Sequence, residues 1–298
     1  TDGAAFALAA STTGASVSVA ALSPATTYFL RVRAVNGDGF GSAYSNTVST
    51  RTPLPAPPAP GVPAGVALST GDVSWSWAGS SGASSYQIVL ASQTGTLLAA
   101  PSTNSVVLTG FGPNSLSSVA VRGVNVDGMG VLSGAAAVYT LAAAPASLVF
   151  VSVGSASAVL SWDPAGNAAG TVFRTQVSFD GGAYVDGSSG TATTQTVPAL
   201  LPSSTYAFRV RAENGDAVVT AFSNVVSTLT FPPLPGTPGA PVGVALSTVE
   251  VAWSWAPSSD SVSYEVTLAS KTSERLASTG AAGVTGAGLG RQRSGPGA

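Results

Sequence analysis

The chain has 298 residues, of which 8% are charged, and 11 Lys plus Arg against 13 Asp plus Glu leave a net charge of −2. Such a balance offers no basic surface for nucleic acid, and the absence of Cys and His excludes disulfides, thiolate or imidazole metal sites and Ser-His-Asp or Cys-His catalysis. Ser, Gly or Pro interrupts every apolar run well before the roughly 18 to 20 residues that a membrane-spanning helix needs.

The chain repeats itself in a fixed register, without insertion or deletion across two windows. Residues 24–50 match residues 202–228 at 16 of 27 positions, and residues 65–92 match residues 243–270 at 18 of 28. This repeat is a double period of two modules of about 90 residues each, because a similar Trp-bearing strand recurs at Trp77, Trp162 and Trp255. We therefore interpret the chain as a half module, two whole modules and a further half, an excerpt of a larger array.

Residues 1–52 are predicted to be the C-terminal half of a module. Their clearest strand covers residues 22–36, where Tyr28, Leu30 and Val32 alternate with outward arginines on the core-facing side. A half module lacks the opposing sheet that should cover this apolar face, so we expect the face to be left uncovered. An Asn-Gly-Asp turn follows this strand at Asn36, as it does at Asn214 in the later copy.

Residues 53–61 are expected to form a Pro-rich linker in extended polyproline II conformation. The first whole module is predicted over residues 62–140, with Trp75 and Trp77 on an alternating strand. Ser117 stands where the other copies have a corner Tyr, so this corner should pack more loosely. A second whole module is predicted over residues 145–231, followed by a second Pro-rich linker over residues 232–241. Residues 242–278 are expected to be the N-terminal half of a module, and residues 279–298 a Gly-rich disordered tail.

A module of this length with a core Trp on its second strand, a Leu-x-Pro-x-Thr-x-Tyr corner and an alternating strand ending in Asn-Gly resembles a fibronectin type III domain. The resemblance covers residues 1–278 and implies an all-β fold, with tandem immunoglobulin-like β-sandwiches joined by Pro-rich linkers. It also implies that Tyr28 and Tyr206 are corner tyrosines, whose hydroxyls bond to backbone just upstream. The core Trp residues would be Trp77, Trp162 and Trp255.

The Asn-x-Asp turns that begin at Asn36, Asn125 and Asn214 are candidate calcium sites, since Asn and Asp oxygens suit a hard cation. Each turn offers a single carboxylate, however, whereas calcium takes six to eight oxygen ligands. We therefore interpret them as turns that Asn, Gly and Asp favour by their backbone chemistry.

Two Trp pairs could act as sugar-stacking platforms: Trp75 with Trp77, and Trp253 with Trp255. Each pair has i, i+2 spacing, which places both rings on one face of a strand, and that face also carries a valine. The pattern favours a double-Trp core, with sugar binding as the alternative.

We predict a non-enzymatic structural or adhesive spacer segment of a large bacterial extracellular or cell-surface repeat protein, with no catalytic, cofactor-binding or metal-binding residues. One alternative is an accessory spacer or carbohydrate-binding region of a secreted polysaccharide-degrading enzyme. Another is a self-assembling surface-layer component, in which exposed strand edges mediate lateral contacts. Expected partners are proteins or glycans at a surface, not nucleic acid.

Overall fold

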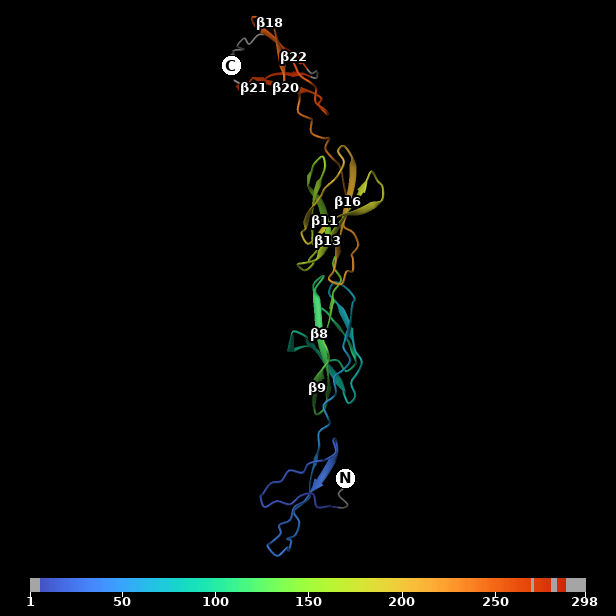
Figure 1. Cartoon of the computed structure of the whole chain (residues 1–298). Helices are drawn as coiled ribbons and strands as arrows, with labels where there is room; N and C mark the ends of the chain where they lie inside the picture. Colours follow the sequence, from blue (N-terminus) through green and yellow to red (C-terminus); the bar gives the residue numbers. More distant parts are fainter. Residues whose placement is uncertain (1–5, 269–270, 280–282, 288–298) are drawn as a thin grey trace, which may run out of the picture.

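The computed structural model describes residues 6–268, 271–279 and 283–287. Within these ranges the regular structure is made of β-strands and contains no helix, so no helix of bilayer-spanning length and hydrophobicity is found there. Two whole modules lie in a row between two partial ones, and the N- and C-terminal regions lie at opposite ends of that row (Figure 1). The all-β fold class predicted from the alternating sequence is confirmed.

The first module contains strands β3 to β10 in two antiparallel sheets. One sheet has the order β3-β4-β7, and the other has the order β10-β8-β5-β6, with β9 paired to β8. Val73 and Trp75 of β4 pack against Ile88 and Val121 of the opposite sheet in one buried cluster. The strands are β3 (Ala64–Ala67), β4 (Val73–Ser76), β5 (Ser85–Leu90), β6 (Gln93–Ala99), β7 (Ser105–Leu108), β8 (Leu116–Asn125), β9 (Gly128–Leu132) and β10 (Ala136–Tyr139).

The second module contains strands β11 to β17 and has the same plan. Its sheets have the orders β11-β12-β15 and β14-β13-β16-β17, and all their strand pairs are antiparallel. The strands are β11 (Ala146–Val153), β12 (Ala158–Asp163), β13 (Val172–Phe179), β14 (Tyr184–Gly190), β15 (Thr194–Val197), β16 (Thr205–Glu213) and β17 (Val226–Leu229).

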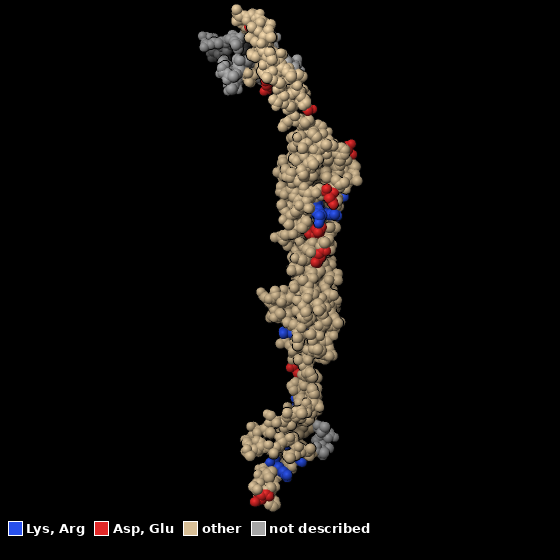
Figure 2. Space-filling view, in the orientation of Figure 1, with Lys and Arg blue, Asp and Glu red and all other residues tan. Residues whose placement is uncertain are grey.

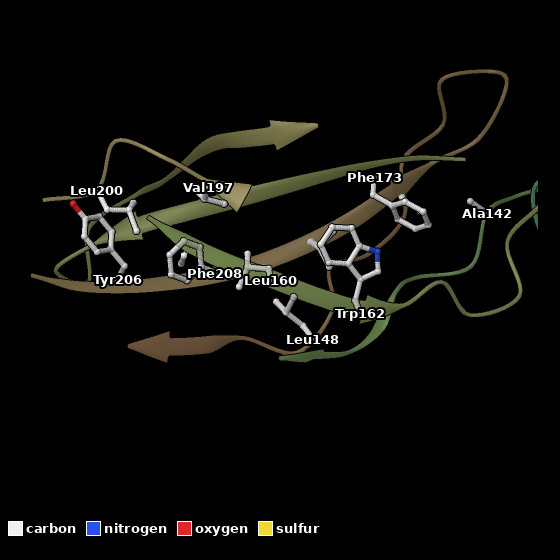
Figure 3. Packing of buried hydrophobic residues seen from close by; sticks show 12 residues of the cluster. Ala142, Leu148, Leu160, Trp162, Phe173, Val197, Leu200, Tyr206 and Phe208 are labelled. Carbon is white, nitrogen blue, oxygen red and sulfur yellow. The ribbon is translucent and has the colours of Figure 1, made fainter. Parts of the chain in front are cut away.

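The core of the second module forms around the Trp that the sequence singled out. Trp162 is 5% exposed, and its ring meets that of Phe173 edge-on with centroids 5.6 Å apart. Leu160 and Phe208 lie beside them between the two sheets (Figure 3). The alternation of β12 and β16 therefore places one face of each strand in a single core.

The tyrosine corners have the predicted geometry. The hydroxyl of Tyr206 accepts a hydrogen bond from the backbone N–H of Leu201 at 2.9 Å, and that of Tyr28 accepts one from Ser23 at 2.8 Å. In the first module, the substituted corner keeps a buried Ser117.

The N-terminal partial module has only two strands among its described residues, β1 (Thr27–Leu30) and β2 (Val48–Arg51), which pair with each other. The apolar face of the 22–36 strand is left uncovered, as the interpretation of residues 1–52 as half a module predicts. Leu30 and Val32 are 49% and 67% exposed, whereas their copies in the second module are fully buried. Among the described residues, no opposing sheet lies over them.

The C-terminal partial module extends further than the sequence predicted. Residues 283–287, expected to be disordered tail, form β22, which pairs with β19. This Gly-containing segment has lost most of its sequence similarity to the earlier copy, but its backbone donors and acceptors pair with the edge of β19. Residues 280–282 and 288–298 of the predicted tail lie outside the described residues. The strands are β18 (Val242–Ser247), β19 (Glu250–Ser254), β20 (Tyr264–Leu268), β21 (Lys271–Thr279) and β22 (Gly283–Ala287).

The repeat also extends to the outer face of the sheets. The guanidinium of Arg209 lies 3.8 Å from the ring centroids of both Tyr184 and Phe222. The same arrangement occurs in the N-terminal partial module, where the guanidinium of Arg31 lies 4.0 and 4.1 Å from two aromatic rings. Such cation–π stacks hold the few arginines against the surface. The rest of the visible surface is mostly uncharged (Figure 2).

Candidate functional site: the joints between modules

The structure gathers polar side chains where one module meets the next. At each of two joints, the Asn-x-Asp turn of a module contacts the segment that leads into that same module. We call these contacts joint 1, between residues 51–57 and the turn at Asn125, and joint 2, between residues 139–143 and the turn at Asn214.

In joint 1 the turn holds the backbone of the incoming segment at two successive residues. The side-chain amide of Asn125 donates to the carbonyl oxygen of Pro55 at 2.7 Å. The carboxylate of Asp127 accepts the backbone N–H of Leu54 at 2.6 Å and lies 3.1 Å from the guanidinium of Arg51. One donor and one acceptor of the turn therefore bind one acceptor and one donor of an otherwise strandless segment.

Joint 2 repeats the arrangement with different linker residues. The side-chain amide of Asn214 donates to the carbonyl oxygen of Thr140 at 3.0 Å. The carboxylate of Asp216 accepts the backbone N–H of Tyr139 at 2.7 Å. In both joints the Asn binds a carbonyl and the Asp binds the N–H one residue earlier, so the same two-point clamp forms twice.

The Asn of each turn is oriented for this task by the turn itself. The side-chain oxygen of Asn125 accepts the backbone N–H groups of Asp127 and Gly128, at 3.0 and 2.9 Å. The side-chain oxygen of Asn214 likewise accepts two N–H groups of its own turn, at 3.0 and 2.8 Å. With the oxygen fixed inward, the amide nitrogen points to the linker.

Two glycines allow the turns to lie close to the incoming segments at the joints. A Cβ at Gly130 would collide with the carbonyl oxygen of Pro57, and one at Gly215 would collide with the ring of Tyr139. A larger residue at either position would force the turn away from the incoming segment.

Joint 2 contains an additional buried polar network centred on Asn114, which is 5% exposed. Its amide donates to the hydroxyl of Thr171 at 2.7 Å, and its oxygen accepts the backbone N–H of Gly215 at 2.8 Å. Asn114 has a φ of 51°, a left-handed conformation that Asn tolerates better than most residues. Because its side-chain oxygen and nitrogen both have partners in the second module, the network fixes how the two sandwiches meet.

The environment of the Asp127 carboxylate in joint 1 favours its charged form. The backbone hydrogen bond from Leu54, with Arg51 adding a smaller effect, lowers the pKa of Asp127 below its ordinary value of 3.8. Both interactions favour the charged form. The clamp therefore keeps its acceptor at all but strongly acidic pH.

The candidate sites from the sequence lie as follows. Trp75 and Trp77 are 0% and 5% exposed, so the core interpretation is confirmed for this pair and their rings are not free to stack on a sugar. Trp253, in the C-terminal partial module, is 40% exposed. In two of the turns that were weighed as calcium sites, the carboxylates of Asp127 and Asp216 accept linker N–H groups. Among the described residues, no three His, Cys, Asp or Glu side chains come close enough to hold a metal ion.

A hollow of about 610 Å³ opens beside β14 in the second module. Apolar side chains form most of its lining, with Phe179, Val185 and Leu200 among them, and Asp186 is its carboxylate. A single acid without a second catalytic group gives no basis for acid–base chemistry. The hollow offers a place for an apolar group and nothing more specific.

Sequence reasoning missed the clamps, although it singled out the turns that form them. The spacing Asn-x-Asp was visible at all three turns, but the partners of the turns are backbone atoms 70 and 77 positions earlier in the chain. Asn114 was also missed. Its only signal was an Asn directly after the corner proline of the first module.

The sequence model of the fibronectin type III domain matches residues 143–228, which span β11 to β17 apart from the last residue of β17. Residues 143–228 form a fibronectin type III domain. The first module has the same two-sheet plan and the same core Trp, so the chain is a tandem array of fibronectin type III β-sandwiches.

Endoglucanase B of Cellulomonas fimi is 34% identical to this chain over 147 residues, which are 46% of this chain and 14% of that enzyme. The chain therefore spans about a seventh of that relative. Two solved structures are also similar. A fibronectin type III domain of human fibronectin type III domain containing protein 3 is 27% identical, with 30% of this chain and 87% of that one covered and a TM-score of 0.28. The FN1-FN3 domains of chicken CNTN1 are 17% identical, with 70% and 78% covered and a TM-score of 0.30.

Proposed function

We propose that this chain is a non-enzymatic spacer within a larger extracellular or cell-surface protein, and that its work is to hold other parts of that protein apart. The observation that carries the proposal is the pair of clamped joints. Each module has its own core, and each incoming segment is bound at two points by the next module. Clamped joints resist folding back, so the array keeps the parts that it connects at a fixed separation and orientation.

Each clamp contributes only a small free energy to the orientation of its joint. An intramolecular hydrogen bond contributes about 0.5 to 1.5 kcal/mol net, so the two bonds of one clamp bias a joint by about 1 to 3 kcal/mol. That is enough to make the clamped orientation dominant, since about 1.4 kcal/mol corresponds to a tenfold ratio at room temperature. Loss of this free energy is far too small to unfold a module.

The similarity to Endoglucanase B supports a second candidate, a spacer region of a secreted polysaccharide-degrading enzyme. This candidate has the same mechanics and differs in what the spacer connects. The same similarity supports a bacterial, extracellular setting, which we propose for this chain. In neither case does the spacer itself catalyse a reaction.

The test measures the distance between the two whole modules directly. Because the chain has no Cys, Ser102→Cys and Thr191→Cys, both at exposed positions, provide a single pair of spin-label sites for a pulsed electron resonance distance measurement. We expect one narrow distance distribution. The variant Asn214→Ala with Asp216→Ala should broaden it while the second module stays folded, at a somewhat lower melting temperature because the Asn214 side-chain oxygen also accepts two N–H groups of its own turn.

The matched control uses the third turn, where Asn36 and Asp38 occupy the equivalent positions of the N-terminal partial module. The same two substitutions there should leave the distribution between modules unchanged. A broad distribution in the unmodified chain would contradict the spacer proposal, and so would a distribution that the joint 2 substitutions do not alter.

A further inference from the structure

The clamp asparagines of the two joints differ in the residue that follows them. Asn214 of joint 2 precedes Gly215, whereas Asn125 of joint 1 precedes Val126. The difference matters chemically, because the backbone nitrogen that follows an Asn can attack the carbon of its side-chain amide. Glycine has no Cβ and reaches the required geometry easily, whereas the stiff, branched side chain of valine hinders the approach. Joint 2 therefore contains the more reactive of two equivalent asparagines.

The packing of joint 2 requires this glycine. A Cβ at Gly215 would collide with the ring of Tyr139, which belongs to the incoming segment. Val126 occupies the equivalent position of joint 1 and is 80% exposed, so a side chain has room there. The close approach of the two modules at joint 2 thus brings a reactive dipeptide with it.

In the closed joint, the attacking nitrogen is held by a side chain of the first module. The N–H of Gly215 donates to the side-chain oxygen of Asn114 at 2.8 Å. Asn114 is 5% exposed, and its own amide is fixed on the hydroxyl of Thr171 at 2.7 Å. Attack requires the nitrogen to lose its proton, and the bond to Asn114 stabilises the protonated form. Among the contacts of the described residues, no such acceptor is found for the N–H of Val126.

The side-chain amide under attack is held as well. Asn214 is 5% exposed, and its side-chain oxygen accepts the N–H groups of Asp216 and Val218 at 3.0 and 2.8 Å. Its nitrogen donates to the carbonyl oxygen of Thr140 at 3.0 Å. Because this nitrogen is the leaving group, the reaction has to break the bond to Thr140, which is half of the clamp. The reaction therefore belongs to the open joint.

We propose that Asn214 is a deamidation site that Asn114 protects, so that joint 2 reacts only while it is open and then stays open. The deprotonated backbone nitrogen of Gly215 attacks Cγ of Asn214, and a C–N bond forms in a succinimide ring. The side-chain nitrogen leaves as ammonia and takes up the proton that Gly215 lost. Water then adds to one of the two ring carbonyls that flank the nitrogen, that ring C–N bond breaks, and the product is aspartate or isoaspartate.

The product cannot form the clamp again. A carboxylate at position 214 has no N–H to donate to the carbonyl oxygen of Thr140, so two acceptors would face each other. It would also place a second negative charge in the turn that carries Asp216. Asn125 reacts more slowly, so a deamidated chain has joint 1 clamped and joint 2 open. The proposal uses the geometry of joint 2 and does not depend on the spacer role.

The test follows deamidation of the full chain at mildly alkaline pH, by peptide mapping that separates the Asn, aspartate and isoaspartate forms. Asn114→Gly removes the protecting side chain, and glycine adopts the φ of 51° at this position without strain. We expect the rate at Asn214 to rise roughly 2- to 10-fold, the factor that corresponds to the loss of one hydrogen bond. The rate at Asn36, which precedes Gly37, is the internal reference and should not change.

Val126→Gly is the matched variant, because it places the same dipeptide in joint 1 without a protecting acceptor. Asn125 should then deamidate faster than Asn214 within the same molecule. Calorimetry should show that both whole modules stay folded in this variant and in Asn114→Gly.

The consequence for the joint is measured on the deamidated fraction, which ion exchange separates by its additional negative charge. Tyr139 donates its backbone N–H to Asp216 in the clamp, so this amide should exchange its hydrogen faster in the deamidated fraction than in the intact one. The amide of Leu54, which belongs to the clamp of joint 1, should exchange alike in both.

Three results would each overturn the proposal. The first is an unchanged rate at Asn214, relative to Asn36, in Asn114→Gly. The second is a rate at Asn125 in Val126→Gly that does not exceed the rate at Asn214. The third is a deamidated fraction that keeps the exchange protection of Tyr139. None of these measurements depends on the distance between modules, so their failure is distinct from failure of the spacer proposal.

Discussion

Trp162→Ala should unfold the second module at a much lower temperature while the first module melts as before. Trp162 is 5% exposed and packs edge-on against Phe173 at 5.6 Å, and truncation of a buried Trp typically costs about 3 to 5 kcal/mol. A domain of this size loses about 4 to 8 °C per kcal/mol, so the melting temperature should fall by roughly 12 to 40 °C. The expected loss approaches the whole stability of a module, which is about 5 to 15 kcal/mol.

Differential scanning calorimetry measures this with Trp77→Ala as the matched control. Trp77 is also 5% exposed and packs edge-on against Tyr86 at 5.5 Å in the first module. Each substitution should move one transition and leave the other in place. If either substitution moved both transitions by the same amount, the modules would share one cooperative unit and the reasoning from separate cores would be wrong.

Three further outcomes are expected. Gly215→Ala should broaden the distance between modules without lowering the melting temperature of the second module, because the new methyl meets the ring of Tyr139; an unchanged distribution would refute this. Thr230→Val should lower the unfolding free energy of the second module by about 1 to 3 kcal/mol, because Thr230 is 1% exposed and its hydroxyl accepts the N–H of Ser204 and donates to the carbonyl of Leu201. The control Thr52→Val, in the N-terminal partial module, should not affect the second module. In an NMR titration, the amide resonance of Leu54 should shift with a midpoint below 3.8, because its hydrogen bond lowers the pKa of Asp127. The charged carboxylate, and with it the clamp, persists above the lowered pKa and is lost as the pH falls through it. A midpoint at or above 3.8 would contradict the clamp.

The sequence predicted the sandwiches because their signals are local. Alternation in β4, β12 and β16 specifies which face is buried, and the corner motif specifies where Tyr206 bonds its own loop. These features need only neighbouring residues, so they can be interpreted without knowing the partner sheet.

The joints and the ends could not be predicted in the same way. A clamp needs Asn125 and Asp127 to meet backbone atoms of a strandless linker, and backbone partners leave no mark on the sequence. The half-module interpretation does predict that Val32 is uncovered, but the pairing of β22 with β19 depends on which strand edge is open. Alternation tells which face is apolar, but it does not tell whether anything lies over that face.

Small-angle X-ray scattering, extrapolated to infinite dilution so that single chains are measured, tests the central claim most directly. A compact globule of 298 residues would have a radius of gyration of about 19 Å. An array of separate sandwiches with clamped joints predicts a radius well above that value and a distance distribution with a long tail. A radius close to the compact-globule value, with a symmetric distance distribution, would contradict the account.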